Sequence, residues 1–593
     1  MGKVEYSFKG VEQGSAHWAS DDEKKKFADP EGVPVAKGMY VSFNAGKEIN
    51  KVKQAAITNT NKVVIATSGG GKTEGVIKPD VMQMIGNYFV IDPKGSVYQD
   101  CAYLLKKNGY NIRVLNFYDV DLSHHYNPYA YINSELDVIN LGSDFMNATK
   151  EDGERNDYWT GAAEDFFTSL ILYIYKSKDE TNKSFERVVQ ILTSIDYQDR
   201  KLSPVCEYSL LMEKYAIDRE NEGLDEDKVV LNYKGMKGLP QETLGGVVAN
   251  LQKRLGLWYT EVVSKFTAED EMEFDNFTKP NSKEAIFVIY PIGSTTFKPI
   301  ISMFYQQFIS RMKYMASQKC GGSLPVLLNI EADEICQISK IPTLKDDIAT
   351  IRSLGMRMTF VCQSLTQLEA KYEKEAKDIL SNCGIICFFG SRDDKIRKWL
   401  CEEQIGYTTF KVENKSYSKN GTNESEQGQR RLLITPDELD ILCKEDDDYR
   451  GRGVFLVGFG RPFKTWKIRA DEFHHAEDVY FSWHPEKRER CFTDIEKEFL
   501  PVKEAREKRK SEAQAEKERA VNTHLGEQFE RDYNDADLVS VTDEDFFEEV
   551  YGEATVQYVK QDKKEKKKKG AVKVEFDKDA LFQEVASEIE KRD

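Results

Sequence analysis

Hydrophobic positions in the first 490 residues fall into short, nearly continuous runs that are rich in β-branched side chains. Runs without a polar residue at every second position are typical of strands buried on both faces of a parallel sheet. Because helical stretches separate these runs, the pattern predicts an α/β fold with a mostly parallel sheet. Eight runs predict strands: VVIA (63–66), YFVI (88–91), IRVLNF (112–117), AIFVIY (285–290), VLLNI (326–330), MTFVC (358–362), IICFF (385–389) and VFLVG (454–458).

The clearest amphipathic helix begins near residue 159 and has a stripe of apolar side chains at helical spacing. We interpret this stripe as core packing and not as a cofactor site. Its members are Trp159, Ala162, Ala163, Phe166, Phe167, Leu170, Ile171 and Ile174.

About 110 residues separate this helix from the strand predicted at 285, which is far more than a loop spans. The intervening sequence carries helix-like segments such as SFERVVQILTSI and ETLGGVVANLQKRLGLW, and almost no strand pattern. We therefore expect an all-α domain at 183–275, inserted between two parts of the α/β core at 1–182 and 276–490. The rest of the chain, 491–593, is expected to be a separate tail.

The charge density of the chain rises sharply near residue 500. Residues 501–593 hold 19 Lys and Arg and 25 Asp and Glu, and the mixed-sign stretch at 501–520 predicts a solvated helix. An acidic block with interspersed aromatics follows at 527–553, and then a lysine-rich run at 563–569. Such a tail buries too little apolar surface to offset its ordering entropy, so we expect it to be mobile.

The overall composition is that of a soluble globular protein, with 40% hydrophobic and 31% charged residues. A net charge of −17 excludes a generally basic nucleic-acid coat protein, although it allows nucleic acid in a local basic groove. The ten cysteines form no CxxC pair, which favours a reducing cytoplasm. Cys383 and Cys387 lie in the apolar run CGIICFF, so core positions are favoured over a metal site.

Membrane-spanning segments are not predicted. No run approaches the ~18–20 continuous apolar residues that a membrane helix needs, and the N-terminus has no apolar signal core. We therefore expect that the chain does not cross a membrane by itself.

The sequence VVIATSGGGKT, which ends at Thr73, indicates a phosphate-binding loop between a strand and a helix. Glycines let consecutive backbone N–H groups surround phosphates, and the following helix adds the positive end of its dipole. Ala66 occupies the position of the first glycine of the usual pattern. Lys72 would neutralise the β- and γ-phosphate oxygens, and the Thr73 hydroxyl would bind Mg²⁺. The predicted nucleotide-binding residues are Thr67, Ser68, Gly69, Gly70, Gly71, Lys72 and Thr73.

A phosphate-binding loop needs an acidic partner at the end of a neighbouring strand, and LPVLLNIEADEICQI supplies it. We assign Asp333 to the metal site, holding Mg²⁺ through water, and Glu334 to catalysis, as the base that polarises the attacking water. Glu331 is a competing acid near the same strand end. Adjacent acids after a strand are common on surfaces, so the assignment depends on the loop that ends at Thr73.

Three further polar residues near the strand MTFVC are candidates for catalysis. Gln363 follows the strand directly and could sense the γ-phosphate, while its alternative role is to cap the next helix. Arg352 and Arg357 precede the strand. Either arginine could reach the ATP of a neighbouring subunit, or could be a solvated charge at a helix end.

Taken in order, these motifs resemble the type IV secretion coupling proteins, the TraG/TraD-like conjugation ATPases. The resemblance covers most of residues 14–470. Besides the phosphate-binding loop, it is carried by GSAHWASDDE (14–23), FVIDPKGS (89–96), YNP (126–128), ADE (332–334), CQSLTQL (362–368) and RRLLITPDEL (430–439). In this family the arginine eleven residues before the motif glutamine acts on the neighbouring subunit, which here selects Arg352 over Arg357.

The resemblance implies a homo-hexameric RecA-like P-loop NTPase that uses ATP and Mg²⁺, with an all-α domain at its cytoplasmic entrance. It implies delivery of relaxase-bound DNA to a type IV secretion channel, with DNA held independently of its sequence. The acidic block at 527–553 either only keeps the tail soluble or docks a basic partner such as the relaxase, with its aromatic side chains as anchors.

Family members usually carry membrane helices ahead of the GSA-x-WA motif, whereas 13 residues precede it here. We therefore expect a separate integral membrane protein to recruit this ATPase to the inner face of the bacterial cell membrane, unless the chain is a shortened form.

Two other functions stay open. One is an NTPase that moves only protein substrates or assembles the secretion apparatus, and the other is a scaffold that nucleotide merely stabilises. The combination of Lys72, the acid pair Asp333 and Glu334, and Gln363 favours turnover over the scaffold. Only the family resemblance favours DNA over protein as the cargo.

Overall fold

The computed structural model describes residues 11, 13–42, 48–49, 52–53, 59–150, 157–418, 421–444, 451–458, 460–481, 501–509, 511–512, 515 and 519. The chain forms two compact units, Met1–Glu496 and Lys497–Asp593. In the second unit the described residues are helical, which confirms the start of the helix predicted from residue 501. The expected mobility of the tail, its acidic block and its lysine-rich run lie outside the described residues.

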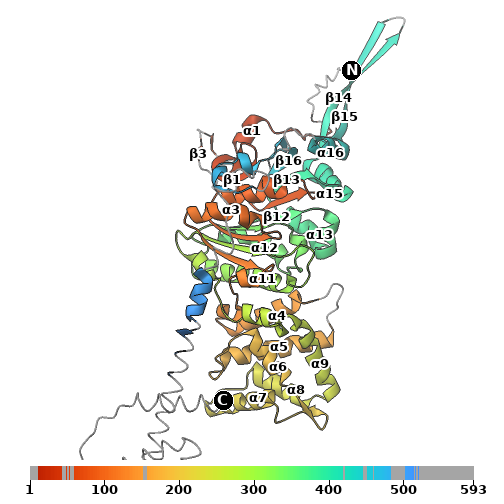
Figure 1. Cartoon of the computed structure of the whole chain (residues 1–593). Helices are drawn as coiled ribbons and strands as arrows, with labels where there is room; N and C mark the ends of the chain where they lie inside the picture. Colours follow the sequence, from red (N-terminus) through yellow and green to blue (C-terminus); the bar gives the residue numbers. More distant parts are fainter. Residues whose placement is uncertain are drawn as a thin grey trace, which may run out of the picture. The chain divides into compact units, whose positions relative to one another are not determined.

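In the part of the chain that the structure describes, the first unit is built on a nine-stranded sheet (Figure 1). The strand order is β17-β16-β13-β5-β12-β11-β6-β10-β7. Neighbours from β13 to β7 run parallel, whereas β16 and β17 at one edge run antiparallel to their neighbours. The strands are β5 (Lys62–Ala66), β6 (Asn87–Asp92), β7 (Asn111–Asn116), β10 (Glu284–Ile289), β11 (Leu328–Ala332), β12 (Met356–Cys362), β13 (Ile385–Gly390), β16 (Arg452–Val457) and β17 (Phe463–Trp466).

All eight strands predicted from apolar runs belong to this sheet, so the predicted α/β class with a mostly parallel sheet is confirmed. The strand predicted at 326–330 begins two residues later, at Leu328. Edge strand β17 has no predicted counterpart, because its sequence FKTW lacks an apolar run.

Helices cover both faces of the sheet, as successive side chains of β6 demonstrate. The Tyr88 hydroxyl donates a 2.9 Å hydrogen bond to the carbonyl of Asp80 in α2 on one face. Phe89 points to the other face and stacks on Phe308 of α11, with ring centroids 4.8 Å apart. The helices next to the sheet are α2 (Lys78–Met82), α3 (Ser96–Lys107), α11 (Lys298–Gln318), α12 (Leu344–Thr350), α13 (Leu365–Tyr372), α14 (Glu375–Ser381), α15 (Asp394–Lys398) and α16 (Pro436–Lys444).

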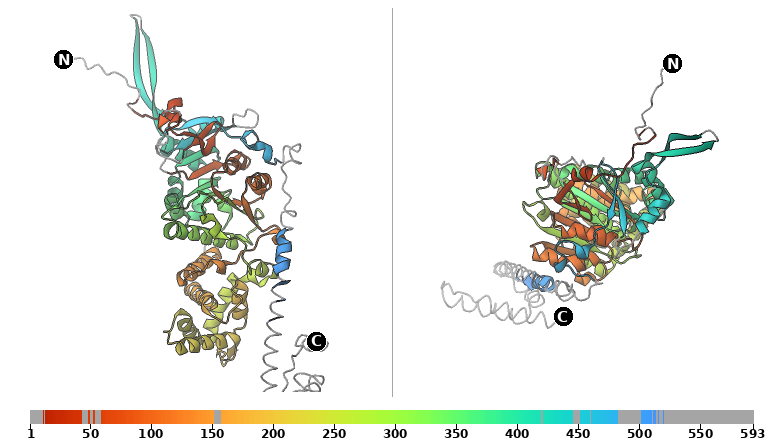
Figure 2. Two further views of the ribbon diagram at one scale, coloured as in Figure 1. Left: turned by 90° about the vertical axis from the view of Figure 1, so that its left-hand side faces the viewer. Right: turned by 90° about the horizontal axis from the view of Figure 1, so that it is seen from above.

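A second group of helices forms a separate layer that contacts the sheet layer where α4 packs on α11 (Figure 2). Its members are α4 (Glu135–Ala148), α5 (Tyr158–Lys176), α6 (Phe185–Thr193), α7 (Glu207–Asn221), α8 (Lys228–Gly238), α9 (Gln241–Arg254) and α10 (Glu261–Phe266). The central helix α5 packs against α4, α8 and α9. The domain limits at 183 and 275 stay predictions, and α5, which precedes the first limit, is part of this packing.

The apolar stripe of α5 is buried as predicted, except at its start. Trp159 is 39% exposed, and its ring lies 2.7 Å from where a Cβ on Gly246 of α9 would be. Glycine at this position therefore lets α9 approach the tryptophan. The buried members of the stripe are Ala163, Phe166, Phe167, Leu170, Ile171 and Ile174.

Short elements complete the described chain. The two-stranded sheets pair β1 (Ala28–Ala36) with β2 (Met39–Val41), β3 (Glu48–Ile49) with β4 (Val52–Lys53), β8 (Tyr197–Gln198) with β9 (Lys201–Leu202), and β14 (Tyr407–Ser418) with β15 (Gly421–Leu432). Helix α1 spans Asp21–Lys25. Helical turns of π or 3₁₀ type are η1 (Thr73–Ile77), η2 (Val120–Leu122), η3 (Pro128–Tyr131), η4 (Gly256–Tyr259), η5 (Phe274–Thr278), η6 (Ile335–Gln337), η7 (Ile351–Leu354), η8 (Trp399–Ile405), η9 (Ala470–Glu472) and η10 (Ala476–Asp478).

A buried network of charged side chains fixes α2 against the centre of the sheet. Lys62 of β5 lies 2.8 Å from Asp80 of α2, and Thr359 of β12 donates a 3.1 Å hydrogen bond to the same carboxylate. Arg357 of β12 pairs with Glu331 of β11 at 3.1 Å. Removing one partner of such a buried pair typically costs about 3–5 kcal/mol, because the other charge stays buried without compensation. Since α2 follows the predicted phosphate-binding loop, this network holds the loop's helix in place.

The GSA-x-WA motif holds the base of the β14–β15 hairpin, which extends away from the sheet in Figure 1. The backbone N–H of Ala16 donates a 2.9 Å hydrogen bond to the carbonyl of Tyr407 in β14, and Ala19 donates one of 2.8 Å to Pro462. A Cβ on Gly14 would lie 2.5 Å from the Tyr407 carbonyl oxygen. The motif therefore needs glycine first, because its backbone lies directly against the hairpin.

Cys383 and Cys387 are buried free thiols next to and within β13, which confirms their interpretation as core residues. Across the described ranges, no helix combines the length and the apolar character that a membrane span requires.

Candidate active site

The predicted functional residues follow neighbouring strands at one edge of the sheet. Parallel pairing aligns Ile65 of β5 with Cys362 of β12, and Ala332 of β11 with both Phe360 and Ile91. The residues that come directly after these strands therefore meet at the carboxyl edge. This is the edge where ligands bind in open parallel sheets.

The loop after β5 has the backbone geometry that its glycines permit. Gly69 and Gly71 have φ values of +78° and +79°, which L-residues with side chains rarely adopt. The N–H of Gly70 donates a 3.0 Å hydrogen bond to the Thr67 carbonyl, and the N–H of Thr67 donates one of 3.0 Å to Gly390 of β13. The loop is thus a closed turn that is anchored to the neighbouring strand.

Ala66 explains why this loop does without its usual first glycine. The residue is the buried last position of β5, and it is not among the described residues with positive φ. Its methyl group lies 3.2 Å from where a Cβ on Gly70 would be. Alanine therefore fits at this position, because Gly70 next to it has no Cβ that would crowd the methyl group.

Lys72, Thr73, the two acids and Gln363 come together as predicted. Lys72 forms an ion pair with Glu334, and its Nζ lies 3.7 Å from Oδ1 of Asp333. The Thr73 hydroxyl donates a 2.7 Å hydrogen bond to Oδ2 of Asp333, and Gln363 Nε2 donates one of 3.1 Å to Oε1 of Glu334. One network therefore joins the phosphate-binding loop to the ends of β11 and β12.

Glu334 has a left-handed backbone conformation, with φ of +66°. This region is uncommon for residues other than glycine, and strain of this kind concentrates at functional sites. The conformation turns the chain immediately after Asp333 into η6.

The buried acids of the site have raised pKa values. Burial raises the pKa of Asp333, while Lys72 and the hydroxyl of Thr73 oppose this rise. Burial also raises the pKa of Asp92, at the end of β6, to about 7. Asp92 accepts hydrogen bonds of 2.7 and 2.9 Å from the N–H groups of Val97 and Tyr98, so it fixes the first turn of α3 beside the site.

The donor set fits a magnesium ion. Oδ1 of Asp333 is buried and has no hydrogen-bond partner among the described residues. Thr73 and Asp333 would hold the ion, since their hydroxyl and carboxylate oxygens are the ligands that Mg²⁺ prefers.

The structure separates the competing candidates. Glu331 and Arg357 are fully buried partners in the charged network between the sheet and α2. Neither residue therefore faces the loop at Lys72 or a neighbouring subunit. Arg352 lies in η7, which precedes β12, and its side chain is exposed. This position is at the amino edge of the parallel strands, opposite the phosphate-binding loop. The site of this chain therefore does not include Arg352.

Two residues at the carboxyl edge of the sheet, near the phosphate-binding loop, were not predicted as site residues from the sequence. Tyr290 follows β10, and its buried hydroxyl has no hydrogen-bond partner within the described ranges. Lys467 follows β17, and its Nζ donates a 3.2 Å hydrogen bond to the Gly70 carbonyl. Neither residue belongs to a motif, and only the order of the strands brings them to the site.

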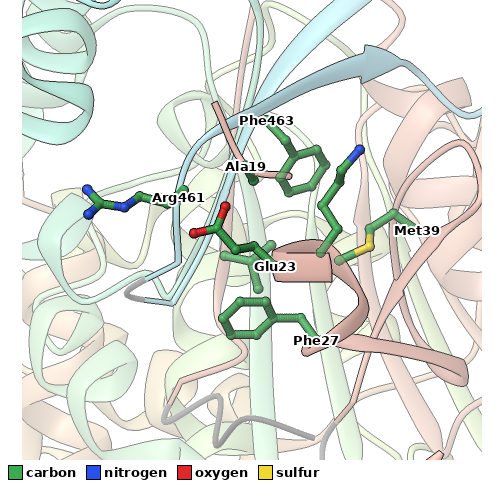
Figure 3. A pocket seen from close by; sticks show the side chains of 8 residues that line it. Ala19, Glu23, Phe27, Met39, Arg461 and Phe463 are labelled. Atoms are coloured by element: carbon green, nitrogen blue, oxygen red, sulfur yellow. The ribbon is translucent and has the colours of Figure 1, made fainter. Parts of the chain in front are cut away.

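A small surface pocket lies at the amino edge of the parallel strands, where β16 ends and β17 begins (Figure 3). Because β16 is antiparallel to β13, its last residue is remote from the loop that follows β5. This pocket is therefore separate from the candidate active site. Its lining residues are Ala19, Glu23, Lys24, Phe27, Met39, Val457, Arg461 and Phe463.

Comparison with known proteins gives consistent matches. The family profile described as "Type IV secretory system Conjugative DNA transfer" matches residues 17–458. "Protein VirD4" of Rhizobium radiobacter is 23% identical over 424 residues, which cover 69% of this chain and 56% of the relative. "Conjugal transfer protein TraG" of Escherichia coli is 21% identical, covering 68% of this chain and 65% of the relative. The chain thus aligns with between about half and two thirds of the length of these relatives.

Solved structures share the fold. The unbound coupling protein TrwB, lacking its N-terminal segment, superposes with a TM-score of 0.54 at 15% identity, covering 79% of this chain and 96% of that chain. TrwB in complex with ADP and Mg²⁺ superposes with a TM-score of 0.53 at 13% identity, covering 79% and 95%.

Proposed function

The chain belongs to the type IV secretory system conjugative DNA transfer family, and from this premise we propose that it is an ATP-driven coupling protein. It moves relaxase-bound DNA to a conjugative secretion channel. The observation that supports this proposal most strongly is the hydrogen-bonded group of Lys72, Thr73, Asp333, Glu334 and Gln363 at one edge of the sheet.

The chemistry assigned to this group is ATP hydrolysis. Lys72 and the backbone of the loop hold the phosphates, with Lys72 moving from Glu334 to the nucleotide. Thr73 and Asp333 hold Mg²⁺, which neutralises charge on the β- and γ-phosphates when it is bound. Glu334 then accepts the proton of the attacking water, and Gln363 links the state of Glu334 to the end of β12. A TrwB structure with a non-hydrolysable ATP analogue supports the same use of the fold.

The assembly is also part of the proposal. Subunits form a homo-hexamer in which Arg352 reaches the ATP of a neighbour. Residues 1–182 and 276–490 form the motor core, 183–275 the inserted all-α domain, and 491–593 a tail that helps to recruit the relaxase. A separate integral membrane protein holds the ATPase at the cytoplasmic face of the bacterial membrane, next to the channel.

DNA is held through its phosphates, because a motor that tracks the backbone cannot depend on base sequence. With a net charge of −17, the contacts come from a minority of lysines and arginines. We expect ATP hydrolysis by the full chain to rise when single- or double-stranded DNA of unrelated sequences is added, and this rise to shrink steeply between low and physiological salt. Steady-state phosphate release, with Lys72→Ala as the inactive control, measures both.

Each contrary outcome identifies another function. Hydrolysis that depends on Lys72 but ignores DNA at low salt would contradict a DNA motor and favour a protein-moving NTPase. Nucleotide that stabilises the protein without being hydrolysed, with or without DNA, would favour a scaffold.

A further inference from the structure

Lys467 follows the edge strand β17 and contacts the phosphate-binding loop, which follows β5 three strands away. Strand β17 is antiparallel to β16, which is antiparallel to β13, so β17 runs in the same direction as β5. Lys467 therefore leaves β17 at the carboxyl edge, where the loop lies. Its side chain is nearly buried, at 8% exposure, and its Nζ lies 3.2 Å from the Gly70 carbonyl oxygen.

The surroundings of Lys467 define the position of its ammonium group. Nζ lies 5.0 Å from the ring centroid of Phe389 in β13. The backbone N–H of Lys467 donates a 3.2 Å hydrogen bond to Gly451, and a Cβ on Gly451 would lie only 3.0 Å from Nζ. The ring of Phe389 thus lies next to the ammonium group, and the missing side chain of Gly451 leaves room for it.

The hydrogen bond to Gly70 controls the direction of the next N–H group. In a trans peptide the C=O and N–H point in opposite directions, so fixing the Gly70 carbonyl also fixes the N–H of Gly71. Glycines flank this peptide on both sides and adopt positive and negative φ with similar ease. The Gly70–Gly71 peptide can therefore rotate unless something holds it.

We propose that Lys467 is a positioning residue for nucleotide binding, which selects the orientation of the Gly70–Gly71 peptide in which the Gly71 N–H faces the phosphates. The proposal rests on the proposed function, because it assumes that the loop binds a nucleotide. A hydrogen bond from a charged donor also polarises the peptide and strengthens its N–H as a donor. Lys467 acts through the backbone of the loop and does not itself react.

The test is equilibrium binding of Mg²⁺-ATP to the full chain. Lys467→Met should raise the dissociation constant about tenfold, equivalent to about 1.4 kcal/mol. In steady-state hydrolysis KM should rise more than kcat falls. Lys467→Arg should bind Mg²⁺-ATP more tightly than Lys467→Met, because the guanidinium keeps a charged donor. Lys464→Met is the matched control, since Lys464 is an exposed residue of the same strand with its Nζ 5.1 Å from the ring centroid of Trp18.

Contrary results distinguish this inference from the proposed function. If Lys467→Met binds Mg²⁺-ATP as tightly as the wild type while Lys72→Ala does not bind it, the positioning role is wrong and the nucleotide site stands. If Lys72→Ala also binds normally, the proposed nucleotide site fails. Melting temperatures without nucleotide separate a binding defect from a folding defect. Should Lys467→Met not fold, Lys467→Gln removes the charge with a polar side chain of similar shape and is expected to weaken binding in the same way.

Discussion

Replacement of Glu334 with glutamine is expected to leave Mg²⁺-ATP bound and to reduce its hydrolysis by about 10²–10⁴-fold, the usual contribution of a general base. Glutamine has nearly the same shape but cannot take a proton from water. Its amide oxygen can still accept the 3.1 Å hydrogen bond from Gln363. Equilibrium nucleotide binding and single-turnover hydrolysis measure the two effects separately.

Two variants sharpen this prediction. Lys72→Ala removes the cation that is proposed to hold the β- and γ-phosphates, so it should abolish nucleotide binding itself. Glu331→Gln changes the competing acid, which is fully buried against Arg357, so it should lower the melting temperature while the folded fraction keeps its turnover. Normal hydrolysis by Glu334→Gln would mean that another group is the base.

Loss of Arg352 is expected to reduce turnover by about 10³–10⁵-fold, the contribution of an arginine finger, while nucleotide binding persists. Arg352 is exposed at the amino edge of the parallel strands, whereas the loop lies at the carboxyl edge. If Arg352 takes part in hydrolysis, it therefore acts at the site of a neighbouring subunit, as proposed above. Lys345→Ala is a suitable control, because Lys345 in the preceding helix forms an ion pair with Asp378 at 3.3 Å.

Mixed assemblies test the shared site directly. Arg352→Ala subunits keep Lys72, and Lys72→Ala subunits keep Arg352, so some interfaces in a mixture combine both. Hydrolysis should then partly return when the two inactive variants are mixed. Failure to recover activity at any mixing ratio would contradict an arginine supplied by the neighbour.

The central sheet and the core of its site were predictable because their signals are local. Runs such as YFVI and IICFF indicate fully buried strands, and the loop at 67–73 needs glycines for its backbone geometry. The acids at 333 and 334 were recognisable because they directly follow such a strand.

Other features depend on long-range packing and give weak signals. Glu331 and Arg357 look like ordinary polar residues in the sequence. Only the topology shows that they form an ion pair between the sheet and α2. Lys467 follows an edge strand with few apolar residues, and it reaches the loop because β17 lies two strands beyond β13. The β14–β15 hairpin was not predicted, because its sequence holds no continuous apolar run.

Movement along DNA is the central claim, and displacement of a fluorescent third strand from a DNA triplex measures it most directly. The full chain should release the third strand when ATP and Mg²⁺ are present, at a rate that follows ATP concentration and not the sequence of the duplex. Glu334→Gln should bind the same DNA and nucleotide without releasing the strand. Sustained, DNA-stimulated hydrolysis by the wild type without release of the third strand would contradict a DNA-translocating motor.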